Sequence, residues 1–174
     1  RMCLYGCGAM GPNQVFAVSE VADITALMLY DVAPEAAERL KEEVAPAVKG
    51  EIAIGKTPEE AAQGADIVVS VTRTQTPFFK NAWFKPGMIL FALDTHQMCE
   101  DACILTADKL IVDHPGQCLH RGALKKVAEE GRIDESSLFA TIGELCCGEK
   151  QTPDWARERI LVEAIGIGAL DVAA

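Results

Sequence analysis

Short apolar runs alternate along the chain with amphipathic stretches. The apolar runs predict buried strands, and the amphipathic stretches predict helices that pack on them. Six strands are predicted: Met2–Tyr5, Ala26–Tyr30, Glu51–Ile54, Ile67–Val71, Met88–Leu93 and Lys109–Val112. Strands that alternate with helices are typical of an α/β protein with a doubly wound, mostly parallel sheet. The 174 residues fit a single domain, so we expect residues 1–174 to form one unit.

The helical segments carry recognisable start signals. Pro34 opens one helix, and Thr57 followed by Pro58 gives an N-cap and a first helical position to another. After residue 113 the pattern becomes mainly helical. The predicted helices are Asn13–Val21, Pro34–Val44, Pro58–Gln63, Asn81–Phe84, Glu100–Leu105, Gly122–Glu130 and Leu161–Val172.

A glycine-rich loop follows the first predicted strand and precedes a helix. It has the pattern G-x-G-x-x-G and reads Gly6-Cys7-Gly8-Ala9-Met10-Gly11. In this context the first glycine permits a tight turn, the second lets a pyrophosphate approach the backbone, and the third lets the helix pack close to the sheet. We therefore predict a Rossmann fold whose cofactor-binding residues include Gly6, Gly8, Ala9, Met10 and Gly11.

Asp31 directly follows the second predicted strand, 20 residues after Gly11. A carboxylate at this place accepts hydrogen bonds from the ribose hydroxyls of NAD and repels the 2′-phosphate of NADP. Val32 and Ala33 follow it, so the adjoining sequence offers no cation for that phosphate. The sequence predicts NAD as the cofactor. The alternative is an incidental aspartate beside a structural glycine turn.

Charge and composition exclude several classes of partner. The net charge of −10 argues against nucleic acid and against anionic membranes. No apolar run approaches the roughly 18 residues that cross a bilayer. The seven cysteines follow no metal or disulfide spacing, so we expect reduced thiols, a cytoplasmic location and no metal. His114, Cys118 and His120 cluster in the sequence, but their spacing matches no familiar zinc pattern.

Several further segments have a characteristic order and spacing: Ala65–Val69 with Thr72, Thr74 and Pro77; Trp83 with Lys85–Gly87; Ala107–Asp113 with Gln117 and Gly122; Ile142–Leu145 with Gly148; and Ala164–Asp171. Together they resemble the ornithine cyclodeaminase/μ-crystallin family over essentially the whole chain. The resemblance implies hydride transfer between a nicotinamide and the α-carbon of an amino acid or a cyclic imine. Two departures are Met10, where family members often have Gln, and the loop Asp94–Met98, which lacks their glycine and proline. The segment Ala164–Asp171 resembles the family's final helix.

The resemblance also implies a second domain. Family members usually carry a substrate and dimerisation domain before the dinucleotide-binding domain, and nothing precedes Arg1 in this sequence. We expect a homo-oligomer or a missing N-terminal substrate domain, and little activity from this chain alone. A stand-alone regulatory module that senses NAD(H) without catalysis is the rival hypothesis, and an enzyme completed by a separate polypeptide is another.

Five residues are candidates for the reaction site. By register in the family, His96 occupies the catalytic acid/base position, and Asp94 would orient it or contact the nicotinamide ribose. A polar loop residue and a turn cap are the alternatives. Thr72 and Thr74 would meet the nicotinamide ribose, unless they cap a turn. Arg73 lies between them, where it would contact ligand or remain solvated at the surface.

Overall fold

The protein is described here by a computed structural model, which places residues 1–166. The chain divides into two compact units, Arg1–Arg73 and Thr74–Ala174, and each is described by itself. The assignment of residues 1–174 to one domain stays a prediction. Within residues 1–166 no helix is both long and apolar enough to cross a bilayer.

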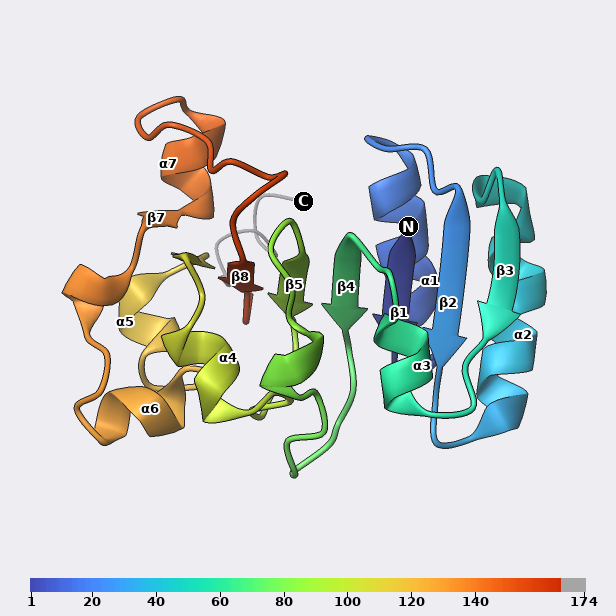
Figure 1. The fold of residues 1–174 in the computed structure, drawn as a ribbon, viewed down its shortest axis with the longest axis horizontal. Coiled ribbons are helices and arrows are strands. Elements are labelled where there is room, and N and C mark those ends of the chain that lie inside the picture. Colours follow the sequence, from blue (N-terminus) through green and yellow to red (C-terminus); the bar gives the residue numbers. More distant parts are fainter. Residues whose placement is uncertain (167–174) are drawn as a thin grey trace. The chain divides into compact units, whose positions relative to one another are not determined.

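The first unit is a parallel sheet with helices on both of its faces (Figure 1). Its strands run in the order β3-β2-β1-β4, and every neighbouring pair is parallel. Helices α1 and α2 cover one face and α3 covers the other (Figure 1). The elements are β1 (Met2–Tyr5), α1 (Gly11–Ser19), β2 (Ala26–Tyr30), α2 (Pro34–Val44), the 3-10 turn η1 (Ala45–Ala47), β3 (Glu51–Ile54), α3 (Pro58–Ala62) and β4 (Ile67–Ser70).

The local sequence explains these helix starts. Proline lies in the first turn of α1, α2 and α3, where its missing N–H costs no helical hydrogen bond. The Thr57 hydroxyl accepts the N–H of Glu60 at 3.1 Å, as the predicted N-cap requires. The buried face of α2 carries Ala36, Ala37, Leu40 and Val44, which follow the helical period.

All four residues of β1 are buried, because helices cover both of its faces and strands border both of its edges. Such a strand has a continuous apolar sequence rather than an alternating one. Because β1 lies in the middle of this sheet, the position of the loop that follows it is fixed.

The second unit contains the remaining strands, in the order β5-β8-β6-β7 and again all parallel. The last strand of the described residues, β8, inserts between β5 and β6 (Figure 1). The elements are the 3-10 turn η2 (Asn81–Trp83), β5 (Ile89–Ala92), α4 (Asp101–Leu105), β6 (Lys109–Val112), α5 (Pro115–Cys118), α6 (Lys125–Glu129), the 3-10 turn η3 (Glu135–Ser137), β7 (Ala140–Thr141), α7 (Ile142–Cys146) and β8 (Ile160–Glu163).

The parallel α/β architecture is confirmed, but the described residues hold eight strands rather than six. The helix predicted over Leu161–Val172 is wrong in its first part, where Ile160–Glu163 is a strand. Strands border β8 on both edges, so its residues are apolar without alternation, and a short run of that kind fits a buried helix equally well. Residues 167–174 lie outside the described part of the chain, as does most of the expected final helix.

Several predicted boundaries move by one to three residues. Helix α6 begins at Lys125 rather than at Gly122, because Gly122 has a φ of +73° and cannot be helical. Helix α1 begins at Gly11, two residues before its predicted start. The short helix predicted at Asn81–Phe84 is the single 3-10 turn η2.

Candidate dinucleotide-binding site

The glycine loop lies at the point where the chain reverses its direction of travel across the first sheet. Strand β1 pairs with β2 on one edge and with β4 on the other. The connections that leave β1 and β4 therefore part at the carboxyl ends of two neighbouring strands. In open parallel sheets this crevice is where ligands bind.

The three glycines of the loop differ in whether a side chain at their position would clash with neighbouring atoms. Gly6 has a φ of +92°, and a Cβ there would lie 2.8 Å from the carbonyl oxygen of Val71. A Cβ on Gly11 would lie 3.0 Å from the oxygen of Gly6 and 3.1 Å from a methyl of Leu40. A Cβ on Gly8 would have no atom within 4 Å, so no contact inside the first unit requires glycine there. Open space above Gly8 is what a phosphate group needs.

Asp31 joins the end of β2 to the glycine loop. Its Oδ2 accepts the backbone N–H of Cys7 at 2.7 Å, and its Oδ1 accepts the N–H of Ala33 at 2.9 Å. Each carboxylate oxygen has two lone pairs, so Asp31 retains acceptor capacity for a hydroxyl. The half-buried carboxylate is thus fixed in orientation before any ligand binds.

The start of α1 completes this part of the site. The helix begins at Gly11, and its first turn contains no acidic residue. Its N–H groups and positive dipole end suit an anion. Ala9 and Met10 are exposed beside it, and Met10 supplies no side-chain cap.

One cation near this loop was not predicted. Arg39, on α2, lines a hollow of about 290 Å³ together with Cys7, Gly8 and Ala9. Glu43 lines the same hollow. Arg39 neighbours Leu40, whose methyl packs against Gly11, so its position follows from helical register. Arg39 is far from the glycine loop in the sequence and shares no motif with it, so the sequence alone could not place it there.

The crevice also includes the residues after β4. The backbone nitrogen of Thr72 is 3.2 Å from where a Cβ on Gly6 would lie, so Thr72 adjoins the glycine loop. Arg73 is exposed. The structure therefore brings Gly6, Asp31 and Thr72 together in one unit.

The other candidate residues lie in the second unit. Thr74 donates its hydroxyl to the carbonyl oxygen of Thr76 at 2.8 Å and accepts the N–H of Thr76 at 3.2 Å, so it does shape a turn. Asp94 follows β5 and is only 3% exposed. His96, two residues later, is exposed. These placements leave the proposed roles of all three as predictions.

His96 lines a hollow of about 520 Å³ that we call the basic pocket. Its lining includes three lysine or arginine side chains and one glutamate, although the protein as a whole has a net charge of −10. Its charged and imidazole residues are His96, His120, Arg121, Lys125, Lys126 and Glu129.

A buried carboxyl group beside this pocket was also missed. Glu163, the last residue of β8, is fully buried, and its carboxyl group accepts the backbone N–H groups of Ala123 and Leu124. Burial raises the pKa of Glu163 to about 8, while the two N–H donors oppose that rise. The sequence pattern predicts a helix around Glu163, so it gives no sign that this residue lies at the end of a strand.

The cysteine and histidine group after β6 includes one buried thiol with a carboxylate partner. The Cys118 thiol donates to Oδ1 of Asp113 at 3.0 Å. Burial, and then that hydrogen bond, raise the pKa of Cys118 to about 12, which disfavours the thiolate that a metal would bind. Within residues 1–166, no three His, Cys, Asp or Glu side chains gather closely enough to hold a metal ion.

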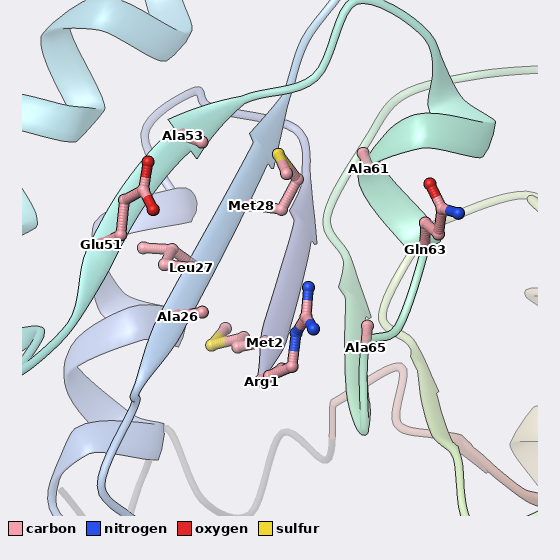
Figure 2. Close-up of a pocket in the computed structure, with 10 residues that line it drawn as sticks. All are labelled: Arg1, Met2, Ala26, Leu27, Met28, Glu51, Ala53, Ala61, Gln63 and Ala65. Atoms are coloured by element: carbon pink, nitrogen blue, oxygen red, sulfur yellow. The ribbon is translucent and has the colours of Figure 1, made fainter.

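A smaller hollow of about 180 Å³ lies elsewhere on the first unit, and Figure 2 shows its lining. Met2, Ala26 and Glu51, which line it, are the first residues of β1, β2 and β3. It therefore opens toward the amino ends of the strands, whereas ligands of parallel sheets bind at the carboxyl ends. We exclude it as the dinucleotide site.

Comparison with known proteins identifies the family. The model of the ornithine cyclodeaminase/mu-crystallin family matches residues 1–174. The chain belongs to this family. It is 29% identical over 171 residues to the alanine dehydrogenase of Archaeoglobus fulgidus, a match that covers 97% of this chain and 52% of that enzyme.

Solved structures agree with the family assignment. The Δ1-pyrroline-2-carboxylate reductase of Thermococcus litoralis, in complex with NADH and L-proline, has a TM-score of 0.87 at 25% identity, over 95% of this chain and 52% of that one. An archaeal alanine dehydrogenase dimer with bound NAD also has a TM-score of 0.87, at 27% identity, over 99% and 54%. The Rossmann-type fold is therefore confirmed. The chain spans about half the length of these relatives.

Proposed function

We propose that this chain is the NAD(H)-binding part of an oxidoreductase that acts on an amino acid or a cyclic imine by hydride transfer at the α-carbon. Family membership supports the reaction class, and the relatives include an alanine dehydrogenase and a pyrroline-2-carboxylate reductase. The chain's location in the cytoplasm, suggested by its free cysteines, and a homo-oligomeric assembly are parts of the same proposal.

The observation that carries the proposal is the fit of the glycine loop to a pyrophosphate. Gly8 leaves open space, Gly6 admits no side chain, a Cβ on Gly11 would crowd Gly6 and Leu40, and α1 starts directly after the loop. A loop that served only to turn the chain would need glycine at Gly6 and Gly11 but not at Gly8. Because packing within the protein does not require glycine at position 8, the loop sequence favours a bound phosphate over a purely structural turn.

The preference for NAD over NADP rests on Asp31. Its carboxylate is fixed by the N–H groups of Cys7 and Ala33, so it cannot swing away from a ribose without losing both hydrogen bonds. A 2′-phosphate would bring like charge to that carboxylate. Arg39 lies along the loop on α2, but it shares its hollow with Glu43, which offsets its charge.

Bound NAD would supply the hydride acceptor, and NADH the hydride donor. In this proposal Asp31 orients the adenosine ribose, the α1 start holds the pyrophosphate, and Thr72, Arg73 and Thr74 contact the nicotinamide half. His96 serves as the acid/base group and Asp94 as its orienting partner. An exposed imidazole at this place suits a proton shuttle.

Calorimetric titration of the purified chain with NADH, and in parallel with NADPH, tests the proposal. We expect NADH to bind and NADPH to bind at least about tenfold more weakly, which is about 1.4 kcal/mol. Tighter NADPH binding would contradict the role of Asp31. Absence of binding by either nucleotide would contradict the assignment of this chain as the NAD(H)-binding part. The rival sensing module predicts NADH-dependent oligomerisation, which sedimentation in the same samples detects.

A further inference from the structure

We propose that the basic pocket of the second unit binds the carboxylate of the amino-acid or imino-acid substrate, with Arg121 as the residue that pairs with it. This inference rests on the proposed function for the identity of the ligand. The resemblance to the family places carboxylate-binding groups in a preceding domain, so Arg121 would be a further specificity-determining residue supplied by this chain.

The size and charge of the basic pocket suit a small organic acid. Its volume of about 520 Å³ lies within the range of ~300–1,000 Å³ that is usual for small-molecule sites. Positive side chains gather around it in a protein with a net charge of −10. A basic pocket on an acidic protein attracts small anions against the average field of the surface.

Arg121 is the cation of this pocket that is left for a ligand. Lys126 is paired with Asp101 at 3.0 Å, and Lys125 lies 3.8 Å from Glu129. Among residues 1–166, the ion pairs do not include Arg121. Its planar guanidinium offers two parallel N–H groups to a carboxylate, which an ammonium group cannot do.

The backbone that carries Arg121 is held in place by a buried group. The carboxyl group of Glu163 accepts the N–H groups of Ala123 and Leu124, so it anchors residues 122–124 to the end of β8. Gly122 has a φ of +73°, and a Cβ there would overlap Oε1 of Glu163. Arg121 therefore leaves a fixed turn, which lowers the entropy lost when it pairs with a ligand.

A second part of the pocket lining is fixed by other hydrogen bonds. The side-chain amide of Gln97 donates to the carbonyl oxygen of Cys99 at 2.8 Å and to Oδ1 of Asp101 at 2.7 Å. Asp101 in turn pairs with Lys126 of α6. The loop that bears His96 is thereby joined to α6, so the candidate acid/base residue and Arg121 line one preorganised pocket.

The test is an NMR titration of the isotope-labelled chain with L-proline, in the presence and in the absence of NADH. L-Prolinamide, which keeps the ring and the amine but lacks the carboxylate, is the comparison ligand. We expect L-proline to shift the backbone resonances of Arg121 and Gly122 and to bind more tightly than L-prolinamide. We expect Arg121→Met to weaken L-proline binding about tenfold or more and to abolish the difference between the two ligands. Arg121→Lys should lie between the two.

Arg157→Met is the matched control, because Arg157 is an exposed arginine of the same unit that does not line the pocket. It should bind L-proline as the unchanged chain does. Equal affinities of Arg121→Met and Arg157→Met, or no shift of any second-unit resonance by L-proline, would overturn the inference. A parallel NADH titration decides the proposed function separately, since the titration without NADH reports on the pocket alone.

Discussion

Oδ2 of Asp31 accepts the backbone N–H of Cys7 at 2.7 Å, so the residue that selects the ribose also holds the loop that binds the phosphates. The two recognition elements are therefore not independent. A change at Asp31 is expected to alter the loop as well as the nucleotide preference.

Asp31→Asn should lower NADH affinity about tenfold or more, because it removes a charge-assisted acceptor from the ribose hydroxyls. The ratio of NADPH to NADH affinity should rise, because the repulsive carboxylate is gone. Calorimetry measures both. Asp23→Asn makes the same charge change at an exposed site paired with Lys49, and it should leave the ratio unchanged. An unchanged ratio in Asp31→Asn would remove Asp31 from the site.

Gly6→Ala should mainly affect stability, whereas Gly8→Ala should mainly affect NADH binding. Gly6→Ala should lower the free energy of unfolding by about 2 kcal/mol or more, because a residue with φ of +92° is strained and its Cβ would press on Val71. Gly8→Ala should change stability by less than about 0.5 kcal/mol, since its Cβ meets no atom within 4 Å. Yet Gly8→Ala should abolish detectable NADH binding. Denaturant unfolding and calorimetry separate the two, and intact NADH binding in Gly8→Ala would refute a phosphate at that position.

The pKa of Glu163 predicts how stability depends on pH. Its value in the folded protein is about 8, above the ordinary 4.5, so the unfolded chain releases this proton at lower pH than the folded protein does. The stabilising contribution of protonated Glu163 to the free energy of unfolding is fully present below about pH 4.5 and is lost as the pH rises toward 8. Within that window its slope is at most about 1.4 kcal/mol per pH unit.

Glu163→Gln, a neutral replacement of the same shape, should flatten this slope. It should be close to the unchanged protein at pH 5 and more stable than it above pH 8, as measured by denaturant unfolding across that range. Glu149→Gln, at an exposed site, controls for the change in net charge. A stability difference between the two proteins that stays constant from pH 5 to pH 8 would contradict the raised pKa of Glu163, because the carboxyl group would then already be ionised in the folded protein at pH 5.

Thiol accessibility gives a further test of the fold. Cys146 and Cys147 are exposed, and the other five cysteines are buried. Burial raises the pKa of Cys3 and that of Cys7 to about 12. A disulfide reagent should therefore modify two thiols rapidly in the native protein and seven after denaturation. The double variant Cys146→Ser, Cys147→Ser should lose the rapid phase. Rapid modification of a third thiol would contradict the packing around the buried residues.

Local physics explains how much the sequence could predict. The glycine loop, β1 and α2 were found at or near their observed bounds, because turn glycines, proline starts and period-3.6 apolar spacing act within a few residues. Strand β8 was missed because its burial comes from β5 and β6, which lie about 70 and about 50 residues earlier in the chain. Its four-residue apolar run has no period that separates strand from helix.

The site residues also divide into those set by nearby sequence and those set by contacts between distant parts of the chain. The positions of Gly6, Gly11 and Asp31 could be predicted because their motif is contiguous and each has a steric or electrostatic reason. Arg39 and Glu163 could not, since each reaches its neighbours only through tertiary structure. For Asp94 and His96, the sequence supplied a role through family resemblance, and only a direct measurement of proton transfer can assign it.

The contact between Gly122 and Glu163 implies covariation between two distant positions. A side chain at position 122 can be accommodated only when position 163 gives up its long acid, and an acid at position 163 depends on a turn without a Cβ. Through evolution the two sites should change together, 41 residues apart. Loss of one partner alone would leave either a steric overlap or two backbone amides without an acceptor.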